Sequence, residues 1–527
     1  MTQSQLIETM KMVNFYPHNP AEVELIETHI SYVFIAGELV YKVKKPVKFD
    51  FLDFTSLEKR KFYCEEELRL NKRLAPNTYL DVVAISRDSQ GNIILGKGVE
   101  IIDYAVRMKK LPADRMLKNL LVQGLVDEKI MDNLAGKIAA FHIQAQTGGH
   151  IDKMGDIENI RNNNKENFSE TINYINVTIP GYQYNFIKDY TENFLTEKKT
   201  LLEKRVTDHK IRDGHGDLHL EHICVADEII IFDCIEFNER FRCGDIAEDV
   251  AFLTMDLDFN GYPQHADIFI ESYIKHSGDT DLSALLNFYR CYYAYVRGKV
   301  TSFRLDQEEL QGFERGQITK NAARYFDLAY TYATRLDKPA LILTAGLMGS
   351  GKSYQARALA ARLGAEIIRT DLLRKELFNI QPAERRYEDF GKGIYSDDTS
   401  RIVYDKAYDL VAQKIKQGKA VIIDASFKKQ AERQKAMEMA RNLGVHFYIL
   451  ECICSDEIAK KRLEKRLQKN DNASDGRWAL FQEQKNDFDA INEVAADCHF
   501  IIDTSADAEF TRQEIIRKIK FVADRYL

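Results

Sequence analysis

The chain has 527 residues, which is more than one hydrophobic core normally organises, so we expect two or three domains. Its content of 45% hydrophobic and 29% charged residues excludes a disordered chain, and its net charge of −7 argues against broad adhesion to nucleic acid or membranes. No apolar stretch approaches the ~20 residues that span a bilayer, and residues 1–15 lack the apolar core of a secretory signal. We therefore expect a cytoplasmic protein whose scattered cysteines are reduced.

The N-terminal part of the chain combines strand patterns with later helical ones. Alternating and apolar residues predict β-structure in Ile30–Lys44 and again in Val82–Arg107. After Ala113 the pattern becomes mainly helical, except for a short hairpin predicted near Ile223–Phe232. The order of these elements predicts an α+β domain.

A polar motif, H-G-D-L-H-L-E-H, covers His215–His222 and precedes Asp233 by one predicted hairpin. A kinase-like catalytic loop needs an aspartate that orients the acceptor hydroxyl, a metal ligand five residues later, and a metal-binding aspartate after a hairpin. Asp217, His222 and Asp233 occupy these three positions. Upstream, Lys42 on a predicted strand is the candidate phosphate-binding lysine, and Glu67 on a predicted helix is its candidate partner.

The segment His215–Asp217 with Asp233 resembles the aminoglycoside phosphotransferase family, the small-molecule branch of the kinase-like fold. The resemblance spans roughly residues 20–330. Gly244, Asp245 and Asp249 also fit the family's pattern after the metal-binding aspartate. It implies an α+β kinase-like domain over residues 1–335, with Asp217 catalytic, Lys42 and Glu67 at the nucleotide, and Asp233 as a metal ligand.

His222 departs from that family, which has a metal-binding asparagine at this position. Because Mg²⁺ favours oxygen ligands and imidazole suits softer metals, we expect this unit to be slow with Mg²⁺, to work better with Mn²⁺, or to be inactive. Two alternatives stay open. His222 faces away and packs on the hairpin, or His215, His219 and His222 form a transition-metal site with Asp217.

A break at residues 335–339 separates this unit from a second one, so we predict domains at 1–335 and 336–527. Short apolar strands alternate with helices in the second unit, which predicts an α/β P-loop NTPase fold with a parallel five-stranded sheet. The predicted strands are Leu341–Ala345, Glu366–Arg369, Ala420–Asp424, His446–Glu451 and His499–Asp503.

The loop Gly346–Ser353 follows the first of these strands and fits G-x-x-x-x-G-K-[ST]. In such a loop, backbone N–H groups and the following helix N-terminus cradle phosphates. Lys352 is predicted to reach the β/γ-phosphates of ATP, and the Ser353 hydroxyl to ligate Mg²⁺. The predicted nucleotide-binding residues are Gly346, Gly349, Ser350, Gly351, Lys352 and Ser353.

Charged residues follow the next strands at the edge where a ligand would bind. Asp371 is the candidate general base, with helix capping as its alternative, and Arg374 is a candidate substrate ligand. Asp424 ends a strand and is the candidate that holds Mg²⁺ through water, with a plain strand-end turn as its alternative. Arg462 and Arg466 share one helix face as a candidate lid over the phosphates, with a solvated basic face as their alternative. Arg433 is a weaker candidate on the substrate side.

These motifs resemble the small P-loop kinases, including polynucleotide kinase, zeta-toxin-like kinases and chloramphenicol phosphotransferase, over residues 338–510. The resemblance implies transfer of the ATP γ-phosphate to a hydroxyl of a small molecule, and the whole chain resembles bacterial fusions of an aminoglycoside-phosphotransferase-like domain with such a kinase. Two alternatives are a polynucleotide 5′-hydroxyl kinase, acting on nucleic-acid ends, and a nucleotide-dependent regulatory switch without an acceptor.

Overall fold

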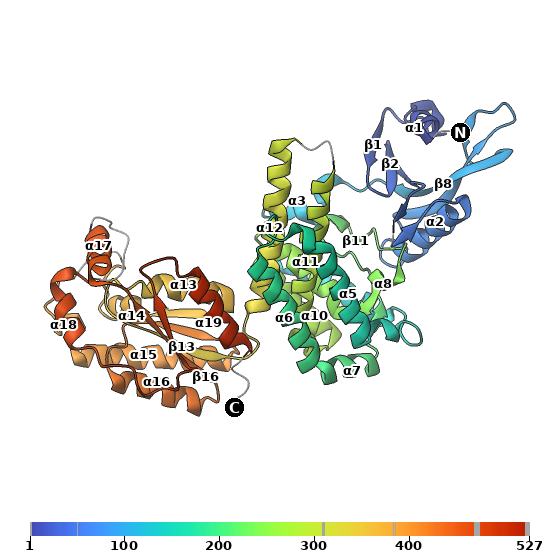
Figure 1. Ribbon diagram of the computed structural model, residues 1–527. Helices are drawn as coiled ribbons and strands as arrows, with labels where there is room; N and C mark the ends of the chain where they lie inside the picture. The colour runs from blue at the N-terminus through green and yellow to red at the C-terminus, as the bar shows by residue number, and fades with distance from the viewer. Residues whose placement is uncertain are drawn as a thin grey trace. The chain divides into compact units, whose positions relative to one another are not determined.

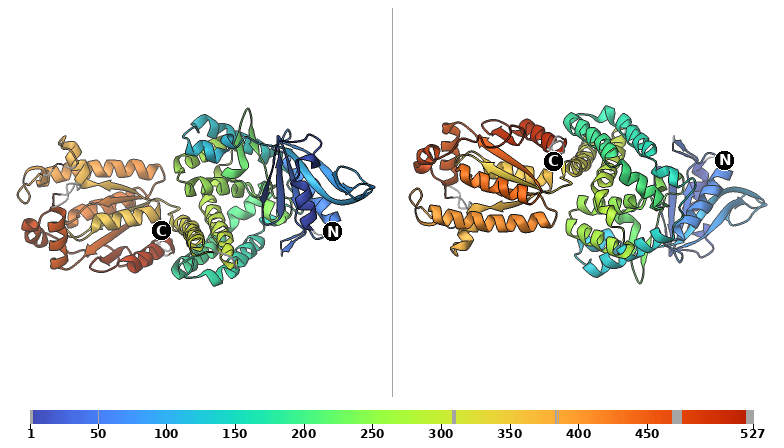
Figure 2. Two further views of the ribbon diagram at one scale, coloured as in Figure 1. Left: turned by 90° about the horizontal axis from the view of Figure 1, so that it is seen from above. Right: turned by 90° about the horizontal axis from the view of Figure 1, so that it is seen from below.

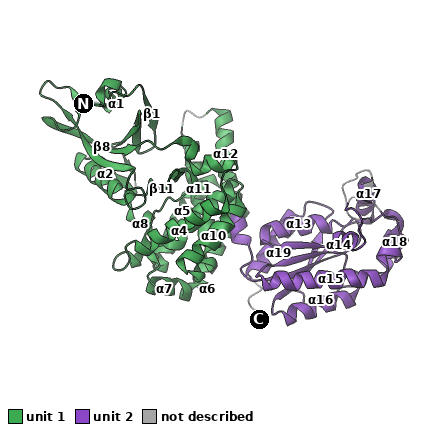
Figure 3. Ribbon diagram, turned by 180° about the vertical axis from the view of Figure 1, so that it is seen from behind, with its two compact units in different colours: residues 1–329 green, residues 330–527 purple. Residues whose placement is uncertain are grey.

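The computed structural model describes residues 3–49, 51–307, 311–382, 384, 386–467 and 475–521. The chain divides into two compact units, Met1–Ala329 and Tyr330–Leu527, which Figure 3 colours separately. The division falls inside helix α12 (Gly312–Thr334), slightly before the break that the sequence predicts at 335. Among the described helices, none combines the length and the apolar character needed to cross a bilayer.

Unit 1 begins with an antiparallel sheet of six strands in the order β1-β2-β3-β8-β6-β7 (Figure 1). Alternate residues of β3 serve opposite faces, because side chains along a strand alternate. Tyr41 and Val43 join an apolar cluster with Met10 of helix α1, whereas Lys42 and Lys44 reach Glu67 on helix α2. The bounds are α1 Gln3–Met10, β1 Val23–Glu27, β2 Ser31–Ala36, β3 Leu39–Lys44, α2 Leu57–Asn71, β6 Tyr79–Arg87, β7 Ile93–Leu95 and β8 Glu100–Lys109.

The rest of unit 1 is mainly helical, as predicted (Figures 1 and 2). Helix α9 packs against α10 and α11, and α4 packs against α10. Two short antiparallel ribbons interrupt the helices, the predicted hairpin β10–β11 and the pair β9–β12, which the sequence analysis missed. The main helices are α3 Leu117–Val122, α4 Glu128–Gln144, α5 Ile157–Thr171, α6 Gly181–Glu197, α7 Lys199–Thr207, α8 Glu239–Arg242, α9 Ile246–Phe259, α10 Pro263–Ser277 and α11 Leu286–Phe303. The ribbon strands are β9 Ile211–Asp213, β10 Ile223–Val225, β11 Ile229–Ile231 and β12 Cys243–Asp245.

Unit 2 contains a five-stranded parallel sheet in the order β14-β15-β13-β16-β17, so this part of the predicted fold is confirmed. Every residue of the central strand β13 is buried, which accounts for its mostly apolar sequence. Its one polar side chain, Thr344, donates a hydrogen bond to the carbonyl of Ala425 over 2.9 Å. Helices α13 and α19 lie on one face and α15 and α16 on the other (Figure 3). The strands are β13 Ala340–Ala345, β14 Glu366–Arg369, β15 Val421–Asp424, β16 His446–Ile453 and β17 His499–Asp503. The helices are α13 Lys352–Leu363, α14 Thr370–Leu377, α15 Asp397–Lys416, α16 Gln430–Asn442, α17 Asp456–Leu467, α18 Phe481–Asn486 and α19 Glu509–Phe521.

Candidate functional site

The loop Gly346–Ser353 joins the end of β13 to the start of α13 at the carboxyl edge of the parallel sheet. Gly346 has a φ of 130°, and a Cβ there would lie 2.3 Å from the carbonyl oxygen of Cys452, so only glycine fits. The hydroxyl of Ser350 is buried and has no hydrogen-bond partner among the described residues. A tight loop with an unused buried donor fits a phosphate group.

Lys352 and Ser353 begin helix α13 and lie at the predicted phosphate and metal positions. The Lys352 ammonium donates to the carbonyl of Leu347 over 2.8 Å, and burial lowers the pKa of Lys352. The Ser353 hydroxyl donates to Oδ1 of Asp424, at the end of β15, over 3.1 Å. These two oxygen donors fit Mg²⁺, a hard cation, and are the residues that would hold it.

The first turn of α14 carries Asp371, which is half-buried. The cap position of this helix is Arg369, and no side chain makes a capping hydrogen bond, so the capping alternative for Asp371 is wrong. The Asp371 carboxylate accepts no hydrogen bond from any residue that the structure describes, although its charge acts on Lys352 and Arg466. It is therefore an unused acceptor beside the phosphate loop.

Arg374 is buried three residues after Asp371, with its guanidinium 4.8 Å from the centre of the Tyr395 ring. Its Nη1 donates to the carbonyl of Ile394 over 2.6 Å, whereas Nε is buried without a hydrogen-bond partner among the described atoms. The structure thus places Arg374 at the segment around Tyr395, with one donor left unused.

Arg462 and Arg466, on helix α17, have different surroundings. Arg462 donates to the carbonyls of Gly349 (3.3 Å) and Thr504 (2.6 Å) and to the Thr504 hydroxyl (2.8 Å), so its guanidinium is engaged with the loop backbone. Burial lowers the pKa of Arg466, while the charges of Asp371 and Asp424 oppose that shift. Arg466, rather than Arg462, is therefore brought toward the carboxylates.

Two loop-holding residues were missed by sequence reasoning. The Thr504 hydroxyl donates to the carbonyl of Ser350 over 2.9 Å, and Oε1 of Gln484 accepts from the N–H of Met348 over 2.7 Å. Thr504 directly follows β17, and a polar residue at the carboxyl end of a parallel strand was the available signal.

Arg433 does not face the site. It is fully buried, pairs with Glu493, and donates to the carbonyls of Phe427 (2.8 Å), Asp489 and Ala490 (both 3.1 Å). Its predicted substrate role is wrong, because all of these contacts join α16 to the neighbouring chain segments.

In unit 1, Lys42 forms ion pairs with Glu67 and Asp233, which are far from each other in the sequence. Its ammonium lies 2.9 Å from Oε1 of Glu67 and 2.6 Å from Oδ1 of Asp233. Lys44, two residues along the same strand, lies 2.8 Å from Oε2 of Glu67 and also pairs with Glu236. Burial opposes ionisation of Glu67, but Lys42 and Lys44 hold its pKa below the ordinary value. Sequence reasoning missed Lys44 and Glu236, although the spacing of Lys42 and Lys44 puts them on one strand face.

Asp217, His222 and Asp233 also lie together. The His222 ring lies between the two carboxylates, with Nδ1 3.5 Å from Oδ2 of Asp217 and Nε2 3.5 Å from Oδ2 of Asp233. The alternative in which His222 faces away is therefore wrong. Burial opposes ionisation of Asp217, but His219 and His222 hold its pKa well below the ordinary value.

The side chain of Asp249 fixes the backbone of the loop before Asp217. Oδ2 and Oδ1 of Asp249 accept from the N–H groups of His215 (2.8 Å) and Gly216 (2.9 Å). Gly216 has a φ of 81°, and a Cβ there would lie 2.5 Å from the carbonyl oxygen of Phe241. These contacts fix the backbone of the loop that carries Asp217.

Comparison with protein families and solved structures concerns unit 2. A family model described as an AAA domain matches residues 341–491. A gluconokinase from Sinorhizobium meliloti is 19% identical, covers 36% of this chain and 96% of its own, and has a TM-score of 0.27. The APS kinase CysC of Mycobacterium tuberculosis is 17% identical, covers 35% of this chain and 99% of its own, and has a TM-score of 0.26.

Comparison with curated sequences covers both units. Rv2004c of Mycobacterium tuberculosis and Mb2027c of Mycobacterium bovis, both described as uncharacterized proteins, are each 30% identical to this chain over 473 residues. Each match spans 90% of this chain and 92% of the relative. The chain therefore belongs to the same protein family as these mycobacterial proteins.

Proposed function

We propose that the unit over residues 336–527 is a kinase that transfers the γ-phosphate of ATP to a hydroxyl of a small molecule. The observation that carries this proposal is the Asp371 carboxylate, which has no hydrogen-bond partner among the described residues. It lies at the sheet edge where Ser353 contacts Asp424. An unused base beside a phosphate loop and a metal-binding pair is the set of groups that phosphoryl transfer requires.

In the proposed reaction the acceptor hydroxyl oxygen bonds to the γ-phosphorus, and the bond from that phosphorus to the β–γ bridging oxygen breaks. The products are ADP and a phosphate monoester, and Asp371 accepts the hydroxyl proton. Lys352 and Arg466 stabilise the charge that develops on the phosphoryl oxygens. Mg²⁺, held by Ser353 and Asp424, would supply further charge neutralisation.

For residues 1–335 we propose a second kinase-like centre, active or relict, with the aminoglycoside phosphotransferase-like architecture. The contacts of Lys42 with Glu67 and Asp233 support it, because a lysine–glutamate pair and a metal-binding aspartate are the kinase-like arrangement. Asp217, with His222 beside it, would orient the acceptor.

A small-molecule acceptor is favoured over a nucleic-acid end. A polynucleotide would need a continuous basic channel, and residues 460–466 were the basic segment available for it. In the structure Lys460 lies over the ring of Trp478, and Arg462 is bonded to Thr504. These two basic side chains therefore make separate contacts within unit 2, which does not support a continuous basic channel for a polynucleotide.

The test is incubation of the full chain with labelled ATP, Mg²⁺ and a cell metabolite extract, followed by mass spectrometry of phosphorylated products. We expect a new phosphate monoester whose rate of formation Asp371→Asn lowers by about 100-fold or more and Asp217→Asn leaves unchanged. ATP consumption without any phosphorylated acceptor would contradict the kinase and favour a regulatory switch. Loss of the product with Asp217→Asn alone would assign the reaction to unit 1 instead.

A further inference from the structure

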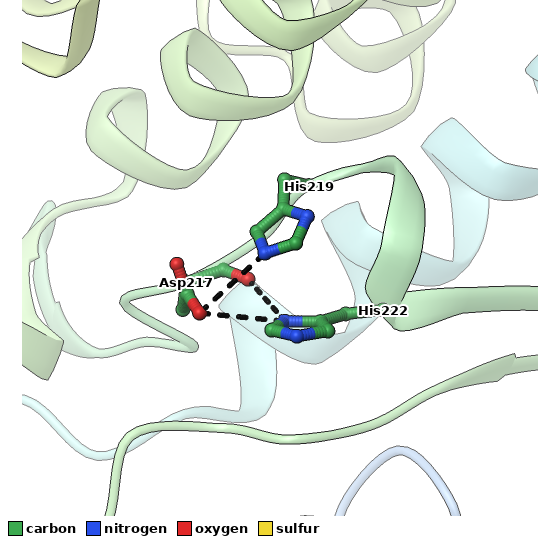
Figure 4. Close-up of side chains that lie close together, drawn as sticks. All are labelled: Asp217, His219 and His222. Carbon is green, nitrogen blue, oxygen red and sulfur yellow. Dashed lines mark hydrogen bonds and ion pairs between the residues drawn. The ribbon is translucent and has the colours of Figure 1, made fainter. Parts of the chain in front are cut away.

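Three side chains in unit 1 converge on one point (Figure 4). One carboxylate oxygen of Asp217, one ring nitrogen of His219 and one ring nitrogen of His222 lie within 4.8 Å of one another. Oδ2 of Asp217 is 3.6 Å from Nε2 of His219 and 3.5 Å from Nδ1 of His222. We propose that this cluster binds one divalent transition-metal ion of the Zn²⁺ type.

The two separations that involve Asp217 fit a shared metal ion. Zn²⁺ takes nitrogen and oxygen ligands at about 2.0–2.2 Å in tetrahedral geometry, which separates neighbouring ligand atoms by roughly 3.3–3.6 Å. The two distances from Oδ2 of Asp217 lie at the upper end of this range. Three protein ligands leave one position open to water or to an anionic ligand.

The donor atoms select the class of metal. Mg²⁺ and Ca²⁺ prefer sets of oxygen ligands, whereas imidazole suits first-row transition metals. Two imidazoles and one carboxylate therefore favour Zn²⁺ or Co²⁺ over Mg²⁺. His215 does not belong to the site, because its Nε2 contacts the carbonyl of Phe232 (3.0 Å) and its Nδ1 accepts from the N–H of Asp217 (3.3 Å).

A second layer of contacts orients the ligands. With a metal on Nδ1, His222 carries its proton on Nε2, which faces Oδ2 of Asp233 at 3.5 Å. A carboxylate behind a ligating histidine is the common arrangement in metal sites. Lys42 anchors that carboxylate at 2.6 Å. The turn between the histidines is fixed by Asp256, whose Oδ2 accepts from the N–H of Leu220 over 3.0 Å.

Metal binding replaces two existing contacts. His222 Nδ1 lies 2.9 Å from the carbonyl oxygen of Asp217, and His219 Nδ1 accepts a long bond of 3.3 Å from the N–H of Glu221. The metal-bound ring tautomers lose both, in exchange for three metal–ligand bonds. The proposed metal site is independent of the proposed kinase function, because binding of the ion needs no phosphoryl transfer by either unit.

The experiment uses the full chain, treated with a chelator and free of nucleotide, titrated with Zn²⁺ by calorimetry and with Co²⁺ by visible absorption. We expect one high-affinity equivalent of Zn²⁺, a Co²⁺ absorption band of a low-coordinate site, and no competition from a large excess of Mg²⁺. His219→Gln and His222→Gln should each weaken Zn²⁺ binding by at least about 100-fold, because removal of a direct ligand exceeds the 10–100-fold loss typical of outer-shell changes. Asp233→Asn should fall within that smaller range.

Two matched controls separate this site from others. His150→Gln changes an exposed histidine and should leave Zn²⁺ affinity unchanged. Ser353→Ala removes the metal-binding hydroxyl of the P-loop and should also leave it unchanged. Retention of wild-type affinity within threefold by both His219→Gln and His222→Gln would overturn the proposal, as would absence of any bound equivalent in the wild type.

A measurement on the wild type alone covers the case in which a variant does not fold. Zn²⁺ should slow hydrogen exchange of the backbone amides in residues 217–222, because the ion bridges both ends of this turn. Zinc bound without protection of these amides lies elsewhere, for example at a free cysteine, and that result also overturns the proposal.

Discussion

The two candidate centres of this protein differ in how their charged groups are already engaged. In unit 2, Lys352 contacts a neutral carbonyl, and Asp371 has no hydrogen-bond partner among the described residues. In unit 1, Lys42 contacts both Glu67 and Asp233. A phosphate arriving in unit 2 displaces a neutral contact, whereas one arriving in unit 1 must compete with two carboxylates. The comparison indicates that the P-loop centre is prepared for a nucleotide and that the other is internally neutralised.

The largest effect is expected when a buried ion pair of unit 1 is broken at Lys44. Lys44→Met removes one partner of Glu67 and Glu236 and leaves buried carboxylates short of a cation, which typically costs about 3–5 kcal/mol of stability. We expect the amides of β3 and α2 to exchange hydrogen much faster, while those of α13 do not change. Lys61→Met is the matched control, because Lys61 forms only an exposed pair on α2. Equal exchange in the two variants would show that the pairs contribute little.

The next effect tests the unused base. Asp371→Asn should lower phosphoryl transfer by about 100-fold or more and keep ATP affinity within a few fold, since general-base catalysis supplies a factor of this size. Single-turnover transfer and nucleotide titration measure the two quantities. Asp405→Asn, at an exposed position of α15, is the control. Wild-type transfer by Asp371→Asn would mean that the base lies elsewhere.

A somewhat smaller effect is expected at the phosphate loop. Lys352→Ala removes a direct phosphate contact and should weaken ATP binding or turnover by roughly tens of fold. The control is Lys414→Ala, which breaks only a partly exposed pair with Glu366. ATP binding and turnover at wild-type levels would exclude the P-loop as the nucleotide site.

Arg462 should have a weaker influence than its predicted role as a phosphate lid implies. Arg462→Ala removes hydrogen bonds to the carbonyls of Gly349 and Thr504, which are each worth about 1 kcal/mol. We expect a several-fold rise in the KM for ATP with little change in kcat. A fall in kcat as large as that of Arg466→Ala would instead place Arg462 at the transferred phosphate.

The smallest expected effect concerns His222. His222→Asn replaces an imidazole by an amide oxygen, which Mg²⁺ prefers, so Mg²⁺-dependent nucleotide binding by unit 1 should improve by a few fold. Calorimetry with ATP and Mg²⁺ or Mn²⁺ measures it, in the Lys352→Ala background, which reduces the contribution of the P-loop. Tight binding of ATP with Mg²⁺ by the parent, with no gain in the variant, would show that His222 does not hinder Mg²⁺.

Local patterns predicted unit 2 well, because its strands are apolar runs and its loop is a contiguous motif. The neighbourhood of Lys42, Glu67 and Asp233 was expected only through a family resemblance, since these residues are far apart in the chain. Arg433 was misplaced for a physical reason: an arginine looks the same in sequence whether it is buried against carbonyls or exposed to a ligand. For the same reason the sequence did not predict the hydrogen bonds of Arg462 to Thr504, and its role as a lid stays a prediction. Lys44 and Glu236 were missed because charged residues are seldom fully buried.

The position of β17 connects the order of the phosphate loop to local opening at one edge of the sheet. Among the described strands this one pairs with β16 alone, so it is an edge strand, and peripheral elements open locally at lower free energy than core ones. Thr504, which directly follows it, hydrogen-bonds Ser350 and Arg462, so a local opening of the edge would remove these contacts from the phosphate loop. Nucleotide bound to the loop would then slow opening of a strand some 150 residues away in sequence. Thr504 thus makes the order of this sheet edge sensitive to what the phosphate loop binds.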